Sequence, residues 1–315
     1  MKFPLFPPQA STIARQVDYL YFYLLAVCGL VLLGILVVMV YFLFKYRRGK
    51  PVNRVRPNLP VHTMEITWTV LPTLIFMSFF TFGAIVYYNQ QRIPDGAMEI
   101  NVVGKQWMWK IQHPGGQREI DELHVPVGRP VKLILASQDV IHSFFLPAFR
   151  IKQDVVPGRY TTEWFQATKV GTFNLFCAEY CGKDHSRMVG KVVVMNPADY
   201  QAWLTQGAPQ PSLVTSGERL FREAGCSGCH MGSTIVRAPR LEGLFGRPVP
   251  LNGGQVVVAD DKYLHDSIVL PGNQIAAGYD NLMPSFKGKL SEEQIFELIA
   301  YLKSLGNKAP ETTQR

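Results

Sequence analysis

Cys177-Ala178-Glu179-Tyr180-Cys181-Gly182-Lys183-Asp184-His185-Ser186-Arg187-Met188 is a segment that places two thiols, an imidazole and a thioether within twelve residues. These are the ligands that soft metals such as copper prefer, and Cys181, His185 and Met188 alone would suit a mononuclear electron-transfer copper. Cys177 adds a second thiolate, so that both sulfurs can bridge two copper ions. A disulfide is the alternative for a cysteine pair in an oxidising compartment, but His185 and Met188 in register favour the metal.

A dinuclear site needs a second imidazole, and His142 is the candidate. It follows the apolar run at residues 131–136 and stands in the sequence Asp-Val-Ile-His-Ser-Phe at 139–144. In a cupredoxin-type sandwich, one ligand comes from an early strand and the others come from a loop between two late strands. This chain has that order. A lone histidine of this kind would be interpreted as a buried structural residue, and only the partner loop favours copper.

These residues closely resemble those of a known family. The loop, residues 139–144 and residues 152–159 (Lys-Gln-Asp-Val-Val-Pro-Gly-Arg) resemble subunit II of cytochrome c oxidase and its dinuclear CuA centre, over about residues 19–200. The resemblance implies that both cysteines bridge the coppers and that each histidine binds one copper. The implied ligands are Cys177, Cys181, His142, His185, Met188 and the backbone carbonyl of Glu179. It also implies that the Glu179 side chain helps to hold a magnesium ion at the junction with subunit I.

The basic residues are concentrated in one short segment. The chain has 315 residues and a formal net charge of +8, a balance that would suit nucleic acid or an acidic surface. However, a cluster of cations lies between two apolar stretches, at Lys45, Arg47, Arg48, Lys50, Arg54 and Arg56. The sequence has no basic face interleaved with aromatics elsewhere, so we expect no nucleic-acid partner.

Two apolar stretches predict a transmembrane hairpin with helices at about residues 19–45 and 67–89. Each can cross a hydrocarbon core of ~30 Å, and the positive-inside rule places the basic connector in the cytoplasm. No signal-peptide core precedes the first helix, which is therefore expected to act as an uncleaved export signal. We expect an integral, two-pass protein of the bacterial cytoplasmic (inner) membrane, with its later domains on the outer, periplasmic side. Cys28, inside the first helix, is interpreted as an apolar packing residue.

Short β-rich runs separated by turn residues predict an all-β, cupredoxin-like Greek-key sandwich after the hairpin. The runs lie at residues 100–103, 131–136, 160–166, 172–176 and 189–195, and they indicate an antiparallel sandwich followed by a helix at 197–204. The predicted organisation is a membrane segment at 1–95, a copper domain at 96–204, a linker at 205–213, an all-α domain at 214–307 and a tail at 308–315.

The all-α domain carries Cys226-Ser227-Gly228-Cys229-His230, the attachment signature of a c-type haem. The two thiols form thioethers to the vinyl groups, and His230 becomes the proximal iron ligand. A redox dithiol or half of a zinc site are the alternatives, but no second cysteine pair remains for zinc. Capping boxes predict two helices, one opening at Thr215 and running through Ala224, the other opening at Ser291 and running to Gly306.

Met283 is the predicted distal ligand of the haem iron, because it lies in a loop just ahead of the last predicted helix. In this respect residues 214–307 resemble a class I cytochrome c, and an axial Met raises the haem potential relative to a second His. Met231 directly follows the proximal ligand and cannot easily reach the opposite face. His265 is the rival ligand.

Two further residues take a role from the resemblance. Trp107 matches the exposed aromatic through which electrons enter CuA, although tryptophans in a sandwich are usually core residues. Met108 departs from the aromatic-rich pattern of the family, which argues against docking of a free cytochrome c in the mitochondrial manner. Glu65 matches the glutamate at the entrance of a proton pathway towards subunit I, and its alternative role is that of a charge at a helix N-terminus.

The resemblance implies subunit II of a haem-copper cytochrome c oxidase that carries its own cytochrome c domain. Electrons would pass from an outside donor to haem c, then to CuA, and then to subunit I, where oxygen is reduced and protons are pumped. The implied partners are subunit I, subunit III, the external donor and membrane lipid. The alternatives are a membrane-anchored electron shuttle, a quinol-oxidase subunit without CuA, and nitrous oxide reductase, whose catalytic domain would need hundreds of further residues.

Overall fold

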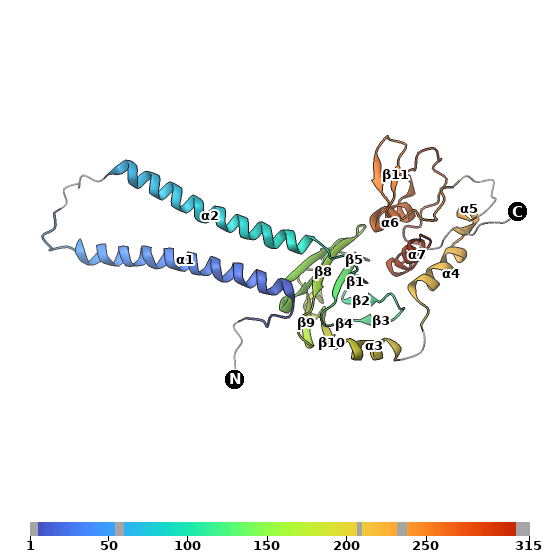
Figure 1. Ribbon diagram of the computed structural model, residues 1–315, viewed down its shortest axis with the longest axis horizontal. Coiled ribbons are helices and arrows are strands. Elements are labelled where there is room, and N and C mark those ends of the chain that lie inside the picture. Colours follow the sequence, from blue (N-terminus) through green and yellow to red (C-terminus); the bar gives the residue numbers. More distant parts are fainter. Residues whose placement is uncertain (1–5, 54–59, 207–209, 232–237, 307–315) are drawn as a thin grey trace.

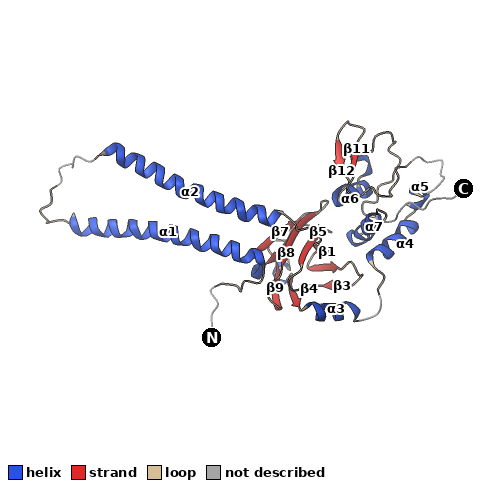
Figure 2. Cartoon of the chain, in the orientation of Figure 1, coloured by secondary structure: helices blue, strands red, loops and turns tan. Residues whose placement is uncertain are grey.

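The computed structural model describes residues 6–53, 60–206, 210–231 and 238–306. Figure 1 shows three parts along one long axis: a pair of long helices, a β-sandwich, and a group of helices near the C-terminus. Strands dominate the middle part and helices the other two (Figure 2). The predicted fold class is confirmed.

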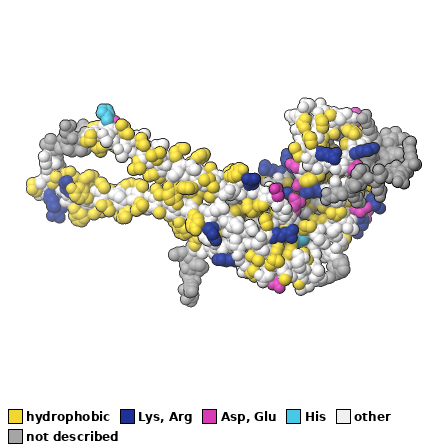
Figure 3. Space-filling view, viewed as in Figure 1, with side chains coloured by type: hydrophobic (Ala, Val, Ile, Leu, Met, Phe, Trp, Pro, Cys, Tyr) yellow, Lys and Arg dark blue, Asp and Glu magenta, His cyan; other side chains and the backbone are white. Residues whose placement is uncertain are grey.

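The hairpin consists of α1 (Thr12–Lys45) and α2 (Val61–Gln91). Both helices begin earlier than the predicted residues 19 and 67. Ser11 caps α1 by accepting a hydrogen bond from the Ala14 amide, and α2 starts directly after Pro60, so the polar first turns also become helical. Both helices are long and apolar enough to cross a membrane, and apolar side chains cover them in Figure 3. Cys28 lies exposed on α1, while Arg54 and Arg56 of the basic segment fall outside the described residues.

The sandwich has two five-stranded sheets, with strand orders β3-β2-β1-β5-β8 and β4-β10-β9-β6-β7. The first contains β1 (Met98–Lys105), β2 (Met108–Gln112), β3 (Arg118–Ile120), β5 (Pro130–Ser137) and β8 (Thr161–Gln166). The second contains β4 (Glu122–Pro126), β6 (His142–Leu146), β7 (Ile151–Val155), β9 (Gly171–Cys177) and β10 (Val189–Met195). Large side chains fill the space between the sheets, among them the fully buried Trp109, Phe144, Phe149 and Phe165.

The sequence predicted an antiparallel sandwich, but the structure contains two parallel strand pairs. β1 pairs with β5, and β4 with β10, in parallel. The reason is that the chain leaves the first sheet for β4 and then returns to it alongside β1. All five predicted runs are strands, but β2, β3, β4, β6 and β7 were not predicted, because their short sequences mix charged, apolar and turn residues.

Five helices and a small β-hairpin follow the sandwich in the described chain. The helices are α3 (Pro197–Thr205), α4 (Leu213–Glu223), α5 (Ser227–His230), α6 (Asp261–Val269) and α7 (Glu292–Ser304), and the hairpin consists of β11 (Pro248–Pro250) and β12 (Val256–Val258). The capping box of α7, formed by Ser291 and Gln294, is confirmed. The predicted cap of α4 was wrong: Ser212, not Thr215, accepts the hydrogen bond. The predicted linker at 205–213 therefore overlaps a helix at each end, and residues 207–209 lie outside the described chain.

Helices α4 and α7 cross closely at Gly217. A Cβ atom at this position would lie 1.9 Å from the carbonyl oxygen of Glu297, so only glycine permits the crossing. Phe296 of α7 packs against Val103, Ile134 and Ala136 of the copper domain.

The α6 and α7 helices dock on the outer face of the first sheet, beside β1 and β2 in Figure 1. Four alternating charges form a closed ring across the two domains: Glu99 bonds Lys132 (2.7 Å) and Lys303 (2.8 Å), and Asp261 bonds Lys303 (2.9 Å) and lies 3.8 Å from Lys132. Beside this ring, Tyr160 lies between His265 and Phe296, with ring centroids 4.5 and 4.8 Å away. We call these seven residues the interdomain interface. The sequence did not predict it.

Two histidines share one carboxylate near α3. Glu119 contacts His113 Nε2 at 2.7 Å and His124 Nδ1 at 2.5 Å, and Trp203 stacks on His124. Burial opposes protonation of His124, but the hydrogen bond and charge of Glu119 outweigh burial and raise its pKa, while the pKa of Glu119 is lowered.

This cluster predicts a pH dependence of stability. Because the pKa of His124 is raised on folding, its charge stabilises the fold below the unfolded-state pKa of about 6.5, and this contribution is lost as pH rises through the folded-state pKa. His124→Gln is therefore expected to lower stability by about 1–2 kcal/mol at pH 6 and by much less at pH 9. Thermal melting of the full chain in detergent at both pH values measures this, and an equal loss at both would contradict it.

Candidate metal centre and haem site

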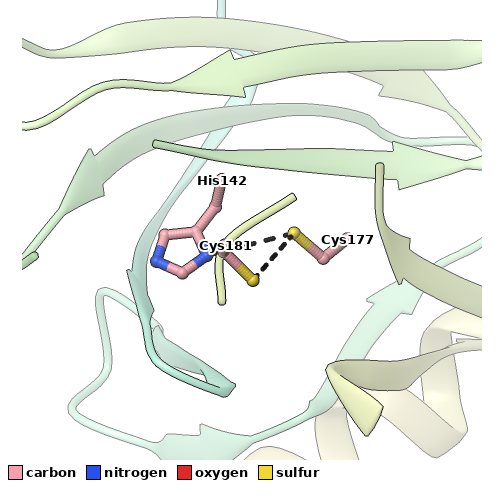
Figure 4. Close-up of side chains that lie close together, drawn as sticks. All are labelled: His142, Cys177 and Cys181. Carbon is pink, nitrogen blue, oxygen red and sulfur yellow. Dashed lines mark hydrogen bonds between the residues drawn. The ribbon is translucent and has the colours of Figure 1, made fainter. Parts of the chain in front are cut away.

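The structure brings residues from three separate positions together at one end of the sandwich. Cys177 ends β9, Cys181 lies in the following loop and His142 begins β6, and their ligand atoms all lie within 4.8 Å of one another (Figure 4). The two Sγ atoms are 3.8 Å apart, and Cys177 Sγ is 3.9 Å from His142 Nδ1. All three residues are buried, and both cysteines are free thiols.

The remaining groups implied by the sequence surround the same two sulfurs. His185 Nδ1 lies 3.4 Å and Met188 Sδ 3.8 Å from Cys181 Sγ, while the Glu179 carbonyl oxygen lies 3.3 Å from Cys177 Sγ. A 3-10 turn, η2 (His185–Arg187), turns the chain so that Met188 points back into the site. The Glu179 side chain is exposed, outside this cluster. Two thiolates, two imidazoles, a thioether and a carbonyl form a donor set that fits copper.

The two thiols have opposite acidities. Burial opposes ionisation of Cys177, but hydrogen bonds from His142 and neighbouring groups lower its pKa to about 6. Burial and the adjacent Cys177 raise the pKa of Cys181 to about 12. One negative charge is therefore favoured at this pair and a second is not, because the sulfurs are close together. A bound cation would remove that repulsion.

Residues that sequence reasoning did not assign hold the ligands in place. Asp139 Oδ1 lies 2.8 Å from His142 Nε2, which leaves Nδ1 facing the sulfurs, as a carboxylate partner does at many metal-bound histidines. Gln106 donates a backbone hydrogen bond to Asp139 Oδ2 and a side-chain hydrogen bond to the Cys181 carbonyl. The sequence offered one indication of the role of Asp139, namely its position three residues before His142.

Trp107 lies against the ligand loop. A Cβ atom at Gly182 would be 3.4 Å from Trp107 Cζ2, so the indole packs over the residue that follows Cys181. Trp107 is partly buried and joins the edge of the core, whereas Trp109 is fully buried and its ring centroid is 5.9 Å from that of His142.

The helical domain contains a mainly apolar cavity of about 250 Å³. Cys226, Cys229, His230 and Met283 all line it, together with apolar residues of α6 and α7 such as Ile268 and Leu298. His230 Nδ1 lies 2.9 Å from the Pro239 carbonyl, which orients the ring and leaves Nε2 available to iron. Two thiols and an oriented imidazole beside an apolar cavity fit a covalently attached haem.

His265 does not line this cavity. Its ring is buried at the interdomain interface, where Nδ1 lies 3.0 Å from Asp266 and Nε2 lies 3.6 Å from Glu292. Met231 is exposed. Of the three candidate distal ligands considered, only Met283 therefore faces the cavity.

Glu65 lies apart from both sites, near the start of α2. Its side chain is 51% exposed and lies 3.4 Å from His62 Nδ1. About half of the Glu65 side chain is therefore accessible for contact with another subunit.

Comparison with known proteins shows the family to which this chain belongs. The cytochrome c oxidase subunit 2 of Alkalihalophilus pseudofirmus is 32% identical over 298 residues, covering 90% of this chain and 85% of that protein. This chain belongs to the cytochrome c oxidase subunit 2 family. The subunit 2 of Cereibacter sphaeroides is 31% identical over 242 residues, covering 64% of this chain and 79% of that protein.

Three family models match this subunit 2 chain in succession. They describe the transmembrane domain of cytochrome c oxidase subunit II (residues 2–83), its periplasmic domain (115–196) and cytochrome c (214–306). Among solved structures, the periplasmic domain of subunit II from Bradyrhizobium japonicum is 33% identical and covers 36% of this chain and 94% of that one, with a TM-score of 0.35. The chain is thus a membrane-anchored subunit of an oxidoreductase complex that carries a cytochrome c domain, and its domains indicate copper and haem c.

Proposed function

We propose that this subunit carries electrons from an external donor to oxidase subunit I, receiving them at its cytochrome c domain and delivering them from its CuA domain. Reduction of oxygen and proton pumping belong to subunit I. The observation that carries this proposal is the convergence of four further donor groups on two adjacent cysteine sulfurs, with a haem-binding signature at a cavity in the same chain.

The copper pair and the haem, when bound, would supply one-electron redox chemistry. The chain supplies the rest. Cys177, Cys181, His142, His185, Met188 and the Glu179 carbonyl would hold the coppers, and burial of both cysteines and His142 excludes water. Cys226 and Cys229 would attach the haem, and His230 and Met283 would bind its iron. Fixed ligands that move little when charge changes are the protein's contribution to fast transfer.

The interdomain interface supports direct transfer between the two domains. A flexible tether would leave the cytochrome domain free to search, whereas a ring of four charges and a stacked aromatic pair hold it in one position. Networks of several charges contribute more to stability than isolated surface ion pairs do. Trp107, which packs against the ligand loop, is proposed as the residue through which electrons reach the copper pair.

Two further roles concern the contact with subunit I. The exposed Glu179 side chain is proposed to help bind magnesium at the contact with subunit I, and Glu65 to stand at a proton entrance from the cytoplasm. Both roles would be superfluous in a free-standing electron shuttle. We further propose a bacterial inner-membrane location with the two redox domains on the periplasmic side, and subunit III as an additional partner.

The visible and near-infrared spectrum of the purified chain tests the cofactor assignment. We expect a haem c spectrum together with that of a mixed-valence copper pair. A chain that binds a mononuclear copper, or none, would overturn the proposal.

Removing the cytochrome domain tests the direction of electron flow. A chain ending at Gln206 is expected to accept electrons from the native donor at least about tenfold more slowly at the copper centre, because it lacks the reductant that the interdomain interface holds against the copper domain. Stopped-flow reduction at low and high salt measures this. Equal rates in the truncated and intact chains would show that the cytochrome domain is not on the main route.

A further inference from the structure

Arg150 lies where the copper domain meets the membrane hairpin. It ends the 3-10 turn η1 (Pro147–Phe149) with a left-handed backbone, φ 57°. This conformation is unfavourable for a residue with a Cβ atom, and glycine is the usual solution. The contacts of the arginine side chain can offset this backbone cost.

The guanidinium group is engaged on every side. Nε and Nη2 donate to the two carboxylate oxygens of Asp18 on α1, at 2.8 and 3.1 Å. Nη2 also donates to the Pro7 carbonyl at 2.7 Å, and Nη1 to the carbonyls of Pro147 and Pro8. The Phe6 ring lies 4.8 Å from Cζ. The ion pair is almost completely buried, with side-chain exposures of 10% for Arg150 and 3% for Asp18.

Other contacts converge on the same place. The segment before α1, residues 6–11, lies along the sandwich: the Ala10 amide donates to the Ala148 carbonyl (2.9 Å) and the Thr168 amide to the Ala10 carbonyl (2.8 Å). From α2, Gln90 donates to the Arg150 carbonyl at 3.4 Å. Both membrane helices and the N-terminal segment therefore meet the copper domain at Arg150.

We propose that Arg150 is a positioning residue that fixes the orientation of the copper domain on the transmembrane hairpin. This inference rests on the proposed function, because the orientation sets where the copper ligands stand relative to subunit I. His142 begins β6, a strand of five residues and about 16 Å in length, and Arg150 lies beyond the other end of that strand, directly after η1. A tilt of about 10° at Arg150 would therefore displace His142 by about 3 Å.

The burial of the Arg150–Asp18 ion pair explains why substitution of either residue should strongly destabilise this contact. Removing one partner leaves the other charge buried without compensation. A lysine keeps the charge but cannot donate in the planar fork that holds both Asp18 oxygens. Loss of the clamp should loosen the N-terminal segment, including Ala10 and Ile13, which pack against the core. The two five-stranded sheets should keep their pairing, because none of their strands comes from this segment.

Hydrogen–deuterium exchange of the full chain in detergent tests the clamp. In Arg150→Met and in Asp18→Asn, the amides of Ala10 and Thr168 are expected to exchange at least about tenfold faster. Amides of β1 and β5 and the copper spectrum should be unchanged. Arg150→Lys should be intermediate, the double variant no worse than the worse single variant, and Lys169→Met, an exposed cation next to Thr168, unchanged.

A second readout uses the assembled oxidase. Transfer from the copper domain to subunit I should slow by about tenfold or more in Arg150→Met, with haem-to-copper transfer inside the chain unaffected. If Ala10 and Thr168 remain protected in Arg150→Met and Asp18→Asn, the clamp is refuted. If Arg150→Met does not fold, Asp18→Asn and Arg150→Lys decide. Absence of a copper spectrum in the unaltered chain would instead refute the proposed function and leave the exchange result standing.

Discussion

Cys181→Ser is expected to abolish the mixed-valence copper signal while leaving the haem c spectrum intact. Cys181 Sγ lies within 3.8 Å of the Cys177, His185 and Met188 ligand atoms, so its loss removes the atom that both halves of the site share. Changes in residues that only support metal ligands cost about 10–100-fold in affinity. Loss of a bridging thiolate should exceed that range, and Cys177→Ser should behave in the same way.

Electron paramagnetic resonance and metal analysis of the purified variants measure this effect. Cys28→Ser is the matched control, because this exposed cysteine of α1 lies far along the chain from the site. A delocalised copper signal that survives in either Cys177→Ser or Cys181→Ser would refute the bridging assignment. Asp139→Asn should give a smaller loss, since Asp139 only orients His142.

Met283→Ala is expected to open the distal side of the haem. The thioethers of Cys226 and Cys229 would keep the haem attached, so the variant should retain the haem and bind carbon monoxide in the ferrous state. Its potential should fall by on the order of 0.1 V, a small part of the ~0.8 V range that axial ligands span. The reason is that Met283 lines the same cavity as the oriented His230, and an axial Met raises the potential.

Potentiometric titration and carbon monoxide difference spectra measure these changes. Met231→Ala is the control, because Met231 is exposed beside the proximal ligand. An unaltered potential with no carbon monoxide binding in Met283→Ala would transfer the distal role to another residue. His265→Gln would then be examined, although the ring of His265 is buried at the interdomain interface.

Short-range sequence features predicted much of the candidate site. Cys177, Cys181, His185 and Met188 lie in one loop, and Cys226, Cys229 and His230 in one turn, so covalent spacing alone keeps each group together. The capping box at Ser291 was equally local and equally visible. His142 needed more, because its place beside the loop depends on the pairing of β6 with β9. Only the order of ligands typical of a cupredoxin pointed to it.

Long-range contacts could not be predicted from the spacing of residues in the sequence. Nothing in the local sequence shows that Gln106 would bond the Cys181 carbonyl or that β1 and β5 would pair in parallel. These contacts depend on how distant segments fold back on one another.

The sequence by itself determined the chemistry: the kinds of ligand, their spacing, the two apolar helices and the order of the domains. Tertiary structure alone decided how these parts are held relative to one another. The charge ring at Glu99, Lys132, Asp261 and Lys303 joins two domains, and the pair of Asp18 and Arg150 joins a membrane helix to the sandwich. The physical reason is that a metal ligand is defined by its own atoms, whereas an ion pair exists only once folding has brought its partners together and removed the water between them.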